Sequence, residues 1–300
     1  MLDRGDAFID HADAVGATVS GSTDTQGEAP KFWVVQDRNG LWHPDDGAFG
    51  QSAVRYALLK FPLPEAGSRA TEMLRCEAAY QLVAQKVGLR VTTELPKFMR
   101  GQALLIPRFD RLVDAHGEVR LGVESLYSIC GILDSAIEPL RHHTAIIELA
   151  RRVSDVEGEI IEYMRRDILN LALGNRDNHG RNTAILKATN GSMRLAPVFD
   201  LTPAFLDARN IVRNLRWDAE PPGEMPHWHE VFLNLYTRFD DASLAVPNLT
   251  LVARALQTFA TTVRALPDTM RDCGVDPQII HARRDRIRTL EKSLQELRAP

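Results

Sequence analysis

The segment LALGNRDNHGRNTAIL (171–186) carries most of the information about the fold and function of this chain. An apolar run ends at Gly174, a polar loop continues to Asn182, and an apolar, β-prone stretch follows. Apolar flanks fix such a loop on a scaffold, which is where catalytic groups tend to lie. Within the loop, Asp177 and Asn182 have the spacing D-x-x-x-x-N. Protein kinases use this spacing to place an aspartate at the acceptor hydroxyl and an asparagine at a magnesium ion.

A second segment, LAPVFD (195–200), adds a carboxylate, Asp200, after a short apolar run. Magnesium prefers hard oxygen ligands, so one amide oxygen and one carboxylate satisfy it when phosphates and water complete the set. An isolated Asp or Asn in a loop is usually an Asx-turn or a helix cap, and D-x-x-x-x-N alone occurs often by chance. The combination of Asn-Arg-Asp-x-His-x-x-Asn with a following apolar-Phe-Asp is far rarer, and it predicts phosphoryl transfer.

Three β-prone runs and one helix are predicted in the N-terminal part of the chain. The helix covers about 71–87 and ends at Gly88, and its apolar residues recur at helical spacing. The β-prone runs are KFWVVQ (31–36), VRYALLKF (54–61) and QALLIPRF (102–109). Residues 1–110 are therefore expected to form a β-rich N-terminal lobe.

The remaining residues, 111–300, are expected to form an all-helical C-terminal lobe. Apolar stripes predict helices over 155–173 and 248–266, and a last helix that begins with Asp276 as N-cap and Pro277 as its first residue. The stripe of this last helix favours docking on its own domain, with a coiled-coil partner as the alternative. The fold class is thus α+β and bilobal, and a ligand cleft often lies between two such lobes.

Composition and charge exclude several classes of function. The 300 residues carry 36 Lys and Arg against 40 Asp and Glu, a net charge of −4 that provides no global field for nucleic acid or anionic lipid. No apolar run reaches the ~18 residues of a membrane helix, and the acidic start is not a secretory signal. Three scattered cysteines form no disulfide framework, so a cytoplasmic location is expected.

Three motifs together resemble those of one known family. GNRDNHGRN (174–182) and LAPVFD (195–200) look like the catalytic and metal-binding motifs of the HipA-like serine/threonine kinases, and IPRFDR (106–111) is similar to the hinge motif of that family. These enzymes are the toxins of bacterial type II toxin–antitoxin modules. The resemblance covers most of the chain and implies a bilobal, protein-kinase-like fold.

The resemblance implies a role for each matching position in the C-terminal lobe. Asp177 resembles the catalytic base, and Asn182 and Asp200 resemble the magnesium ligands that also contact the nucleotide. His179 and Arg181 would lie at the nucleotide phosphates. The implied cofactors are therefore ATP and Mg²⁺.

In the N-terminal lobe, Lys60 resembles the strand lysine that reaches the ATP phosphates, a role that suits a point charge at the end of a rigid strand. Glu77, on the following helix, could pair with Lys60 as in protein kinases, and a solvated glutamate is the alternative. Arg108 and Phe109 would line the adenine pocket, and a core position for Phe109 is compatible with that role.

The segment QGEAPK (26–31) resembles the end of a glycine-rich loop, in which backbone N–H groups and a lysine approach the phosphates. Its nucleotide-binding candidates are Gln26, Gly27, Glu28, Ala29 and Lys31. The family often carries a serine before this loop, and phosphorylation of that serine silences the kinase, but an ungapped count places Asp24 there. We therefore expect weak or absent autophosphorylation, with these neighbouring hydroxyls as candidates: Ser20, Ser22, Thr23 and Thr25.

The resemblance also bears on partners. Only about 20 residues precede the glycine-rich loop, so the chain resembles HipT, the short form of the family, in which a separate small protein supplies an additional N-terminal subdomain. A helix-turn-helix antitoxin and a protein substrate are the other implied partners. The family implies an aminoacyl-tRNA synthetase as the target, with arrest of translation and growth. Direct contact with nucleic acid or a membrane is not expected.

Two alternative functions remain open from the sequence. A small-molecule phosphotransferase would need an acidic acceptor pocket, and the chain offers only the short pairs Asp45-Asp46 and Asp240-Asp241. A pseudokinase that binds nucleotide and partners is compatible with the altered glycine-rich loop.

Two further clusters have weaker signals. The His142-His143 pair and the His227-x-His229-Glu230 motif lack a further ligand at diagnostic spacing, which favours surface or core histidines over a metal site. The basic run ARRDRIR (282–288) is interpreted as a solvated helix face.

Overall fold

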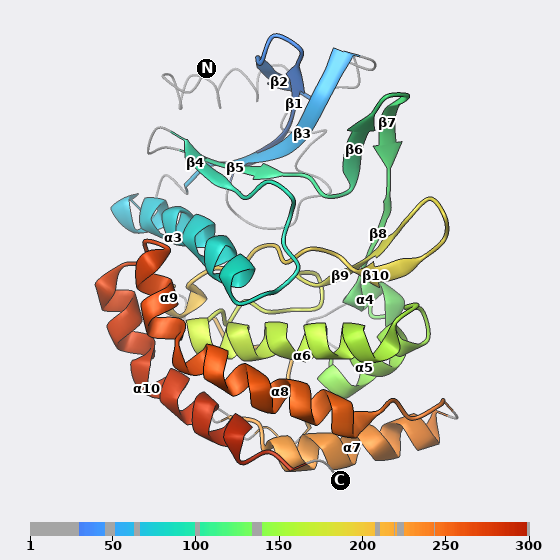
Figure 1. Ribbon diagram of the computed structural model, residues 1–300. Coiled ribbons are helices and arrows are strands. Elements are labelled where there is room, and N and C mark those ends of the chain that lie inside the picture. The colour runs from blue at the N-terminus through green and yellow to red at the C-terminus, as the bar shows by residue number, and fades with distance from the viewer. Residues whose placement is uncertain are drawn as a thin grey trace. The chain divides into compact units, whose positions relative to one another are not determined.

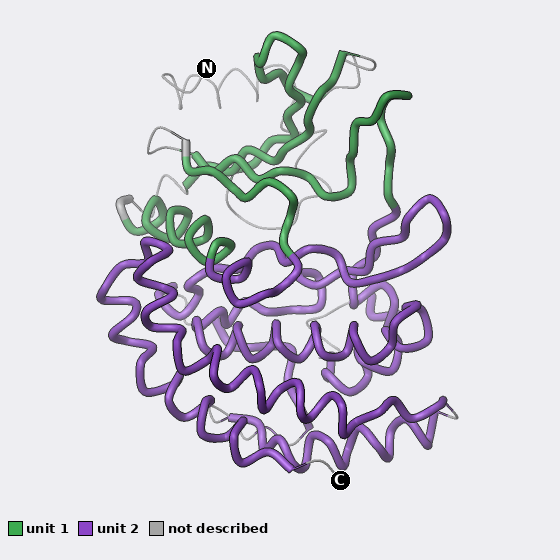
Figure 2. The backbone as a smooth tube through the Cα atoms, viewed as in Figure 1, with its two compact units in different colours: residues 1–82, 91–121 green, residues 83–90, 122–300 purple. Residues whose placement is uncertain are grey.

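The computed structural model describes residues 30–45, 52–62, 67–99, 103–133, 140–207, 211–218, 220, 225–242 and 244–298. Their contacts divide the chain into two compact units (Figure 2). Unit 1 comprises residues 1–82 and 91–121, and unit 2 comprises residues 83–90 and 122–300. Unit 1 extends past the predicted lobe boundary at Asp110 because strand β6 (Arg111–Asp114) packs against strand β3 (Ala53–Lys60).

Unit 1 contains an antiparallel five-stranded sheet of order β2-β1-β3-β5-β4 (Figure 1). Side chains on both faces of the sheet are buried: Phe32 and Val34 belong to one cluster, and Val35 and Tyr56 to another. This alternation along β1 and β3 is what fixes their register. The remaining strands are β1 (Lys31–Asp37), β2 (Trp42–Pro44), β4 (Lys97–Met99), β5 (Ala103–Pro107) and β7 (Gly117–Arg120), which pairs with β6.

Helix α3 (Gly67–Lys86) follows the sheet strand β3, as the sequence predicts. Cys76, Tyr80 and Val83 are buried along one face of this helix. The helix ends at Gly88, whose φ of +81° is in the left-handed region that favours glycine.

Unit 2 is built around helix α6 (Val156–Leu173), against which α5, α8, α10 and strand β10 pack (Figure 1). Asp155 caps the start of α6 by accepting a hydrogen bond from the backbone N–H of Gly158, and Gly174 ends it. The other helices of the unit are α4 (Leu126–Ile129), α5 (His142–Ala150), α7 (Trp228–Asp241), α8 (Leu249–Arg264), α9 (Leu266–Asp272), α10 (Pro277–Gln295) and the 3₁₀ helix η4 (Ala204–Leu206).

A three-stranded antiparallel sheet in unit 2 corrects the expectation of an all-helical C-terminal lobe. Its order is β10-β9-β8, with β8 (Gly122–Ser125), β9 (Ala184–Lys187) and β10 (Met193–Leu195). The β-prone run after Asn182 becomes β9 by pairing with β8, which lies far away in the sequence. The combination of helices and antiparallel sheets agrees with the predicted α+β class.

The C-terminal helix α10 docks on the protein's own core. Asp276 accepts a hydrogen bond from the backbone N–H of Gln278, and Pro277 is the first helical residue, as predicted. The helix packs on α8 and α6, and its apolar stripe is buried: Ile280, Ile287, Leu290, Leu294 and Leu297. The apolar stripe is thus buried against the protein's own helices, as the docking interpretation predicts. Within the described residues, no helix is both long enough and apolar enough to cross a membrane.

Candidate functional site

In unit 1, Lys60 and Glu77 form a buried ion pair. Lys60 Nζ donates to Glu77 Oε2 over 2.8 Å, and the two side chains are 12% and 3% exposed. Lys60 is the last residue of β3, where the register places it opposite Lys31 of β1. A carboxylate buried this deeply needs a cationic partner, so the pair fixes the lysine ammonium at the end of the strand.

Arg108 is held by its own set of contacts within unit 1. Its guanidinium donates to both carboxylate oxygens of Asp110, over 2.9 and 2.6 Å, lies 3.5 Å from Asp45 and stacks on the ring of Trp33 at 4.0 Å. Burial raises the pKa of Asp45, and the Arg108 charge opposes that shift. These contacts anchor Arg108 in its unit, and the adenine-pocket role of Arg108 and Phe109 stays a prediction.

In unit 2, the loop with the D-x-x-x-x-N spacing begins where α6 ends. Gly174 has a φ of +77°, and a Cβ at this position would lie 2.6 Å from the ring of Phe205. Both facts require glycine here. The sequence therefore ends the helix at a defined point and starts the loop there.

The loop folds into a compact turn around the carbonyl of Asp177. This oxygen accepts hydrogen bonds from the side-chain amide of Asn182 (Nδ2, 2.9 Å) and from the backbone N–H of His179 (3.1 Å). Because Nδ2 of Asn182 faces that carbonyl, Oδ1 of the same amide faces the opposite way. The Asp177 side chain is 42% exposed, with Oδ1 3.8 Å from His179 Nε2.

Tyr127 of α4 supports the other half of the loop. Its buried ring stacks on the His179 ring, with centroids 6.3 Å apart, and the Arg181 guanidinium lies 5.8 Å above the same ring. A Cβ on Gly180 would lie 2.4 Å from the Tyr127 ring, so the close approach depends on glycine. Tyr127 was missed in the sequence analysis because nothing in the surrounding LYSI segment distinguishes it from a core aromatic residue.

Asp200 has an unusual backbone conformation for a residue with a side chain. Its φ is +53°, and among the described residues it is the only one other than glycine with a positive φ. Its carbonyl oxygen accepts a hydrogen bond from Asn175 Nδ2 at 3.4 Å, and the same amide donates to Asn170 Oδ1 at 2.9 Å. Asn175, Asn182 and Phe199 also line one small pocket, which places the D-x-x-x-x-N loop and the LAPVFD segment side by side.

A partly buried ion pair holds the segment that leads to Asp200. Arg90 donates to both carboxylate oxygens of Glu159, over 2.9 and 2.8 Å, and to the carbonyl of Leu195 over 2.7 Å. Glu159 in turn accepts from the backbone N–H of Leu195, and the Arg90 carbonyl accepts from the N–H of Val198, each over 2.8 Å. The hydrogen bonds to Glu159 raise the pKa of Arg90. Arg90 and Glu159 thus both hold the LAPVFD segment through hydrogen bonds to its backbone.

The donor set fits magnesium better than a structural metal. The described residues contain no group of three or more His, Cys, Asp and Glu side chains that could hold a metal ion. An amide and a carboxylate, Asn182 and Asp200, suit Mg²⁺ that takes its other ligands from phosphates and water. His142 and His143 are buried side chains in unit 2, in keeping with the core-histidine interpretation.

The basic run in α10 is only partly a solvated face, which corrects the sequence interpretation. Arg284 and Arg288 are exposed, but Arg283 turns inward and donates to the carbonyls of Leu171 (2.7 Å) and Ala172 (2.9 Å) in the last turn of α6. A cation at unpaired helix C-terminal carbonyls is stabilising. Tertiary packing, which the local pattern does not reveal, turns Arg283 inward.

Several predicted residues lie outside the described part of the chain. They are the glycine-rich loop candidates Gln26, Gly27, Glu28 and Ala29, together with Asp24 and the hydroxyls of Ser20, Ser22, Thr23 and Thr25. Lys31, the last candidate of the loop, is the first residue of β1.

A sheet unit with a buried lysine–glutamate pair, and a helical unit that holds the D-x-x-x-x-N loop next to the LAPVFD segment, are features of kinase-like proteins. The family description "HipA-like C-terminal domain" matches residues 23–270, so the chain belongs to the HipA-like C-terminal domain family. A curated relative, "Putative kinase Y4mE" of Sinorhizobium fredii (strain NBRC 101917 / NGR234), is 31% identical over 173 residues. The match covers 51% of this chain and 41% of that protein.

A solved structure with a TM-score above 0.5 shows the same fold. A chain in the Shewanella oneidensis MR-1 toxin–antitoxin complex of HipA, HipB and operator DNA matches with a TM-score of 0.59 and 16% identity, over 91% of this chain and 63% of that one. The Helicobacter pylori proinflammatory kinase CtkA matches with a TM-score of 0.47 and 12% identity, over 81% of this chain and 90% of that one. This protein therefore spans less than two thirds of both its curated relative and the Shewanella chain.

Proposed function

We propose that this protein is an ATP- and Mg²⁺-dependent serine/threonine protein kinase that acts as the toxin of a bacterial type II toxin–antitoxin system. The observation that carries the proposal is the hydrogen-bonded turn that joins Asp177 and Asn182 beside the Asp200 segment. The buried Lys60–Glu77 pair supports it. A decayed kinase tends to lose one member of this set, whereas this chain keeps all of them.

Each residue acts by position and charge. Asp177 orients the acceptor hydroxyl and takes its proton, and Asn182 and Asp200 hold magnesium. Mg²⁺ bound by these two residues would supply positive charge to neutralise the charge that develops during in-line transfer. Lys60 contacts the ATP phosphates, as do His179 and Arg181. Catalysis of this kind depends on placing preorganised charges rather than on a covalent enzyme intermediate.

The biological partners follow from family membership. The Shewanella complex contains HipB with HipA, and we propose that this protein likewise binds a helix-turn-helix antitoxin. A separate small protein equivalent to an N-terminal subdomain is a second proposed partner. The proposed substrate is a cytoplasmic protein, an aminoacyl-tRNA synthetase by family resemblance, whose phosphorylation stops translation and growth.

Phosphoryl transfer from γ-labelled ATP, with and without Mg²⁺, tests the chemistry. Bacterial lysate supplies acceptors, and phosphoamino-acid analysis identifies the acceptor hydroxyl. Wild type and Asp285→Asn, a control whose side chain is 97% exposed, should label serine or threonine. Asp177→Gln should show no label while keeping the wild-type melting temperature.

Other outcomes distinguish the rival functions. Nucleotide binding without transfer by the wild type would favour a pseudokinase, and label found only in small molecules would favour a small-molecule phosphotransferase. Growth arrest on expression of the wild type, and its absence with Asp177→Gln, tests the role as a toxin.

A further inference from the structure

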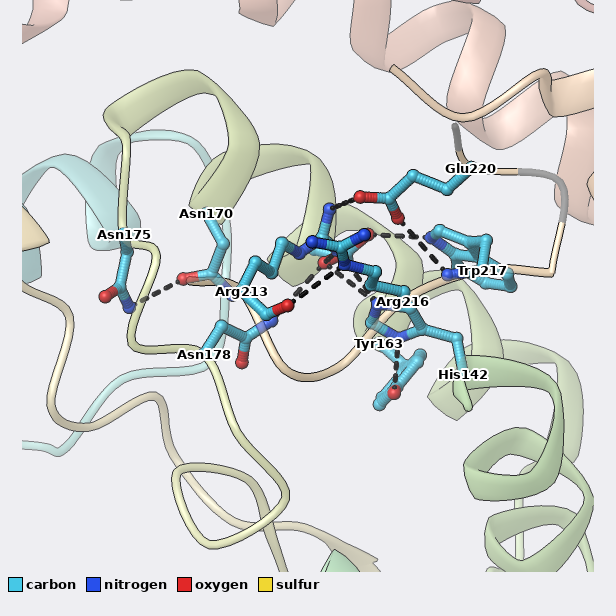
Figure 3. A network of polar contacts seen from close by, with 10 residues as sticks. His142, Tyr163, Asn170, Asn175, Asn178, Arg213, Arg216, Trp217 and Glu220 are labelled. Carbon is cyan, nitrogen blue, oxygen red and sulfur yellow. Dashed lines mark hydrogen bonds and ion pairs between the residues drawn. The ribbon is translucent and has the colours of Figure 1, made fainter. Parts of the chain in front are cut away.

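Helix α6 carries a buried carboxylate, Asp167, that receives side chains from two different loops. Figure 3 shows Asn178, Arg213 and Trp217 among the side chains of this polar network. From the catalytic loop, Asn178 Nδ2 donates to Asp167 Oδ1 over 3.3 Å. From the segment 211–218, Trp217 Nε1 donates to Oδ2 over 2.8 Å, and the Arg213 guanidinium donates to Oδ1. The two loops therefore share one anchoring group.

The charge of this carboxylate is compensated inside the unit. Although burial alone would raise the pKa of Asp167, the Arg213 charge and the hydrogen bonds outweigh burial and lower it. Arg213 also donates to Glu220 Oε1 over 3.0 Å and to His142 Nε2 over 2.8 Å. Because a guanidinium only donates, His142 Nε2 accepts, and the ring proton lies on Nδ1 toward the Tyr163 hydroxyl, 2.7 Å away.

The catalytic loop depends on this contact because Asn178 is the neighbour of Asp177. The Asn178 side chain is buried, so it lies in the protein interior and cannot contact a substrate directly. The backbone between Asp177 and His179 forms no strand or helix. Because no strand or helix holds this backbone, side-chain hydrogen bonds such as that from Asn178 to Asp167 help to fix the position of Asp177.

We propose that Asp167 is a positioning residue for the catalytic loop, and that its carboxylate couples the placement of Asp177 to the docking of segment 211–218. Asp167 acts through Asn178 and does not touch the reacting atoms. The expected effect on turnover rests on the proposed kinase function, whereas the expected effect on loop mobility does not.

Three variants separate positioning from general stability. Asn178→Ala removes only the bond between the catalytic loop and Asp167. Asp167→Asn has nearly the same shape but removes the charge that holds Arg213. Asn190→Ala is the matched control, because Asn190 caps an exposed turn between β9 and β10.

Amide hydrogen exchange of the full-length protein is the first measurement. Asn178→Ala should speed exchange in the loop 175–183 and leave segment 211–218 unchanged, whereas Asp167→Asn should speed exchange in both. Asn190→Ala should change neither. An Asn178→Ala loop that exchanges at the wild-type rate would overturn the proposal.

Steady-state kinetics are the second measurement. Asn178→Ala and Asp167→Asn should each lower kcat by about tenfold, the size expected for one hydrogen bond to a charged group, with the KM for ATP nearly unchanged. The double variant should lose no more kcat than the more damaging single variant, because both changes act on the loop through the same Asn178–Asp167 contact, which Asn178→Ala removes and Asp167→Asn weakens. Additive losses would overturn the coupling. A wild type that transfers no phosphate would instead contradict the kinase function, while hydrogen exchange would still test the anchor.

Discussion

At the scale of single residues, the loop 175–183 is shaped by positions that leave no room for a side chain. A Cβ on Gly180 would lie 2.4 Å from the Tyr127 ring, and real Cβ atoms essentially never approach that closely. The ring itself is buried and stacked on His179, so it cannot move aside freely. Gly180 thus lets the loop lie directly on the aromatic ring.

Gly180→Ala should therefore lower the free energy of unfolding by about 1–3 kcal/mol, the usual cost of overpacking, and it should reduce phosphoryl transfer. Gly122→Ala is the matched control, because its Cβ would meet Lys187 at an ordinary 3.4 Å. Urea unfolding of both variants provides the comparison. Equal losses of stability in the two variants would contradict the steric explanation.

Some residues of the candidate site can be identified from a sequence pattern, and others cannot. Asp167 lies among Met164, Ile168 and Leu171 on the apolar face of α6, and an acidic residue in such a stripe indicates a buried partner. Asn178 was inside the motif, but its inward orientation depends on the fold. Tyr127 had no local signal, because its role arises from contact with a loop far along the chain.

At the scale of secondary structure elements, local sequence patterns correctly predicted features that depend on a few adjacent residues, such as the ends of helices. The helix end at Gly174 and the N-cap at Asp276 are present as expected, because capping depends on a few adjacent residues. The pairing of β8 with β9 was missed because it joins residues about 60 positions apart, whereas β9 and β10 pair locally. Long-range pairing leaves little trace in a short stretch of sequence.

The link between α10 and α6 is a second long-range feature, and it can be tested. Arg283→Met should lower the free energy of unfolding by about 2 kcal/mol, because it removes two hydrogen bonds from a charged donor to the end of α6. Arg284→Met, on the exposed face of the same helix, should stay within about 0.5 kcal/mol of wild type. Urea unfolding monitored by circular dichroism measures both. The link would be refuted if Arg284→Met were as damaging as Arg283→Met.

At the scale of the whole molecule, family and fold class were predictable because a few ordered motifs specify them. GNRDNHGRN and LAPVFD placed the chain in the HipA-like family, and the profile match over residues 23–270 confirms that placement. The hydrogen-bond network around Asp167 was not predictable, because it brings together side chains from α5, α6 and segment 211–218. Such networks become visible only when distant parts of the chain are placed in space.

The buried histidine of this network gives global stability a defined pH dependence. Burial lowers the pKa of His142 to about 3, so below pH 6.5 the unfolded chain binds a proton that the folded protein does not. Stability contributed by neutral His142 is present above pH 6.5 and is lost as the pH falls toward 3. Between pH 7.5 and 5.5 this loss is about 1.4 kcal/mol.

Urea unfolding at the two pH values measures this loss. His142→Gln should lose about 1.4 kcal/mol less than wild type over the same interval. His116→Gln, a variant at an exposed histidine, should keep the wild-type dependence. The same pH dependence in His142→Gln as in wild type would show that another group is responsible.

The contact between α10 and the end of α6 has a consequence for the timing of biosynthesis. Arg283 follows Ala172 by 111 residues. At about 5–20 residues per second, a ribosome needs roughly 6–22 s to add that stretch. During this interval the nascent chain already contains α6, but the carbonyls of its last turn still lack their cationic cap. The order of synthesis therefore delays the capping of α6 until α10 has been made.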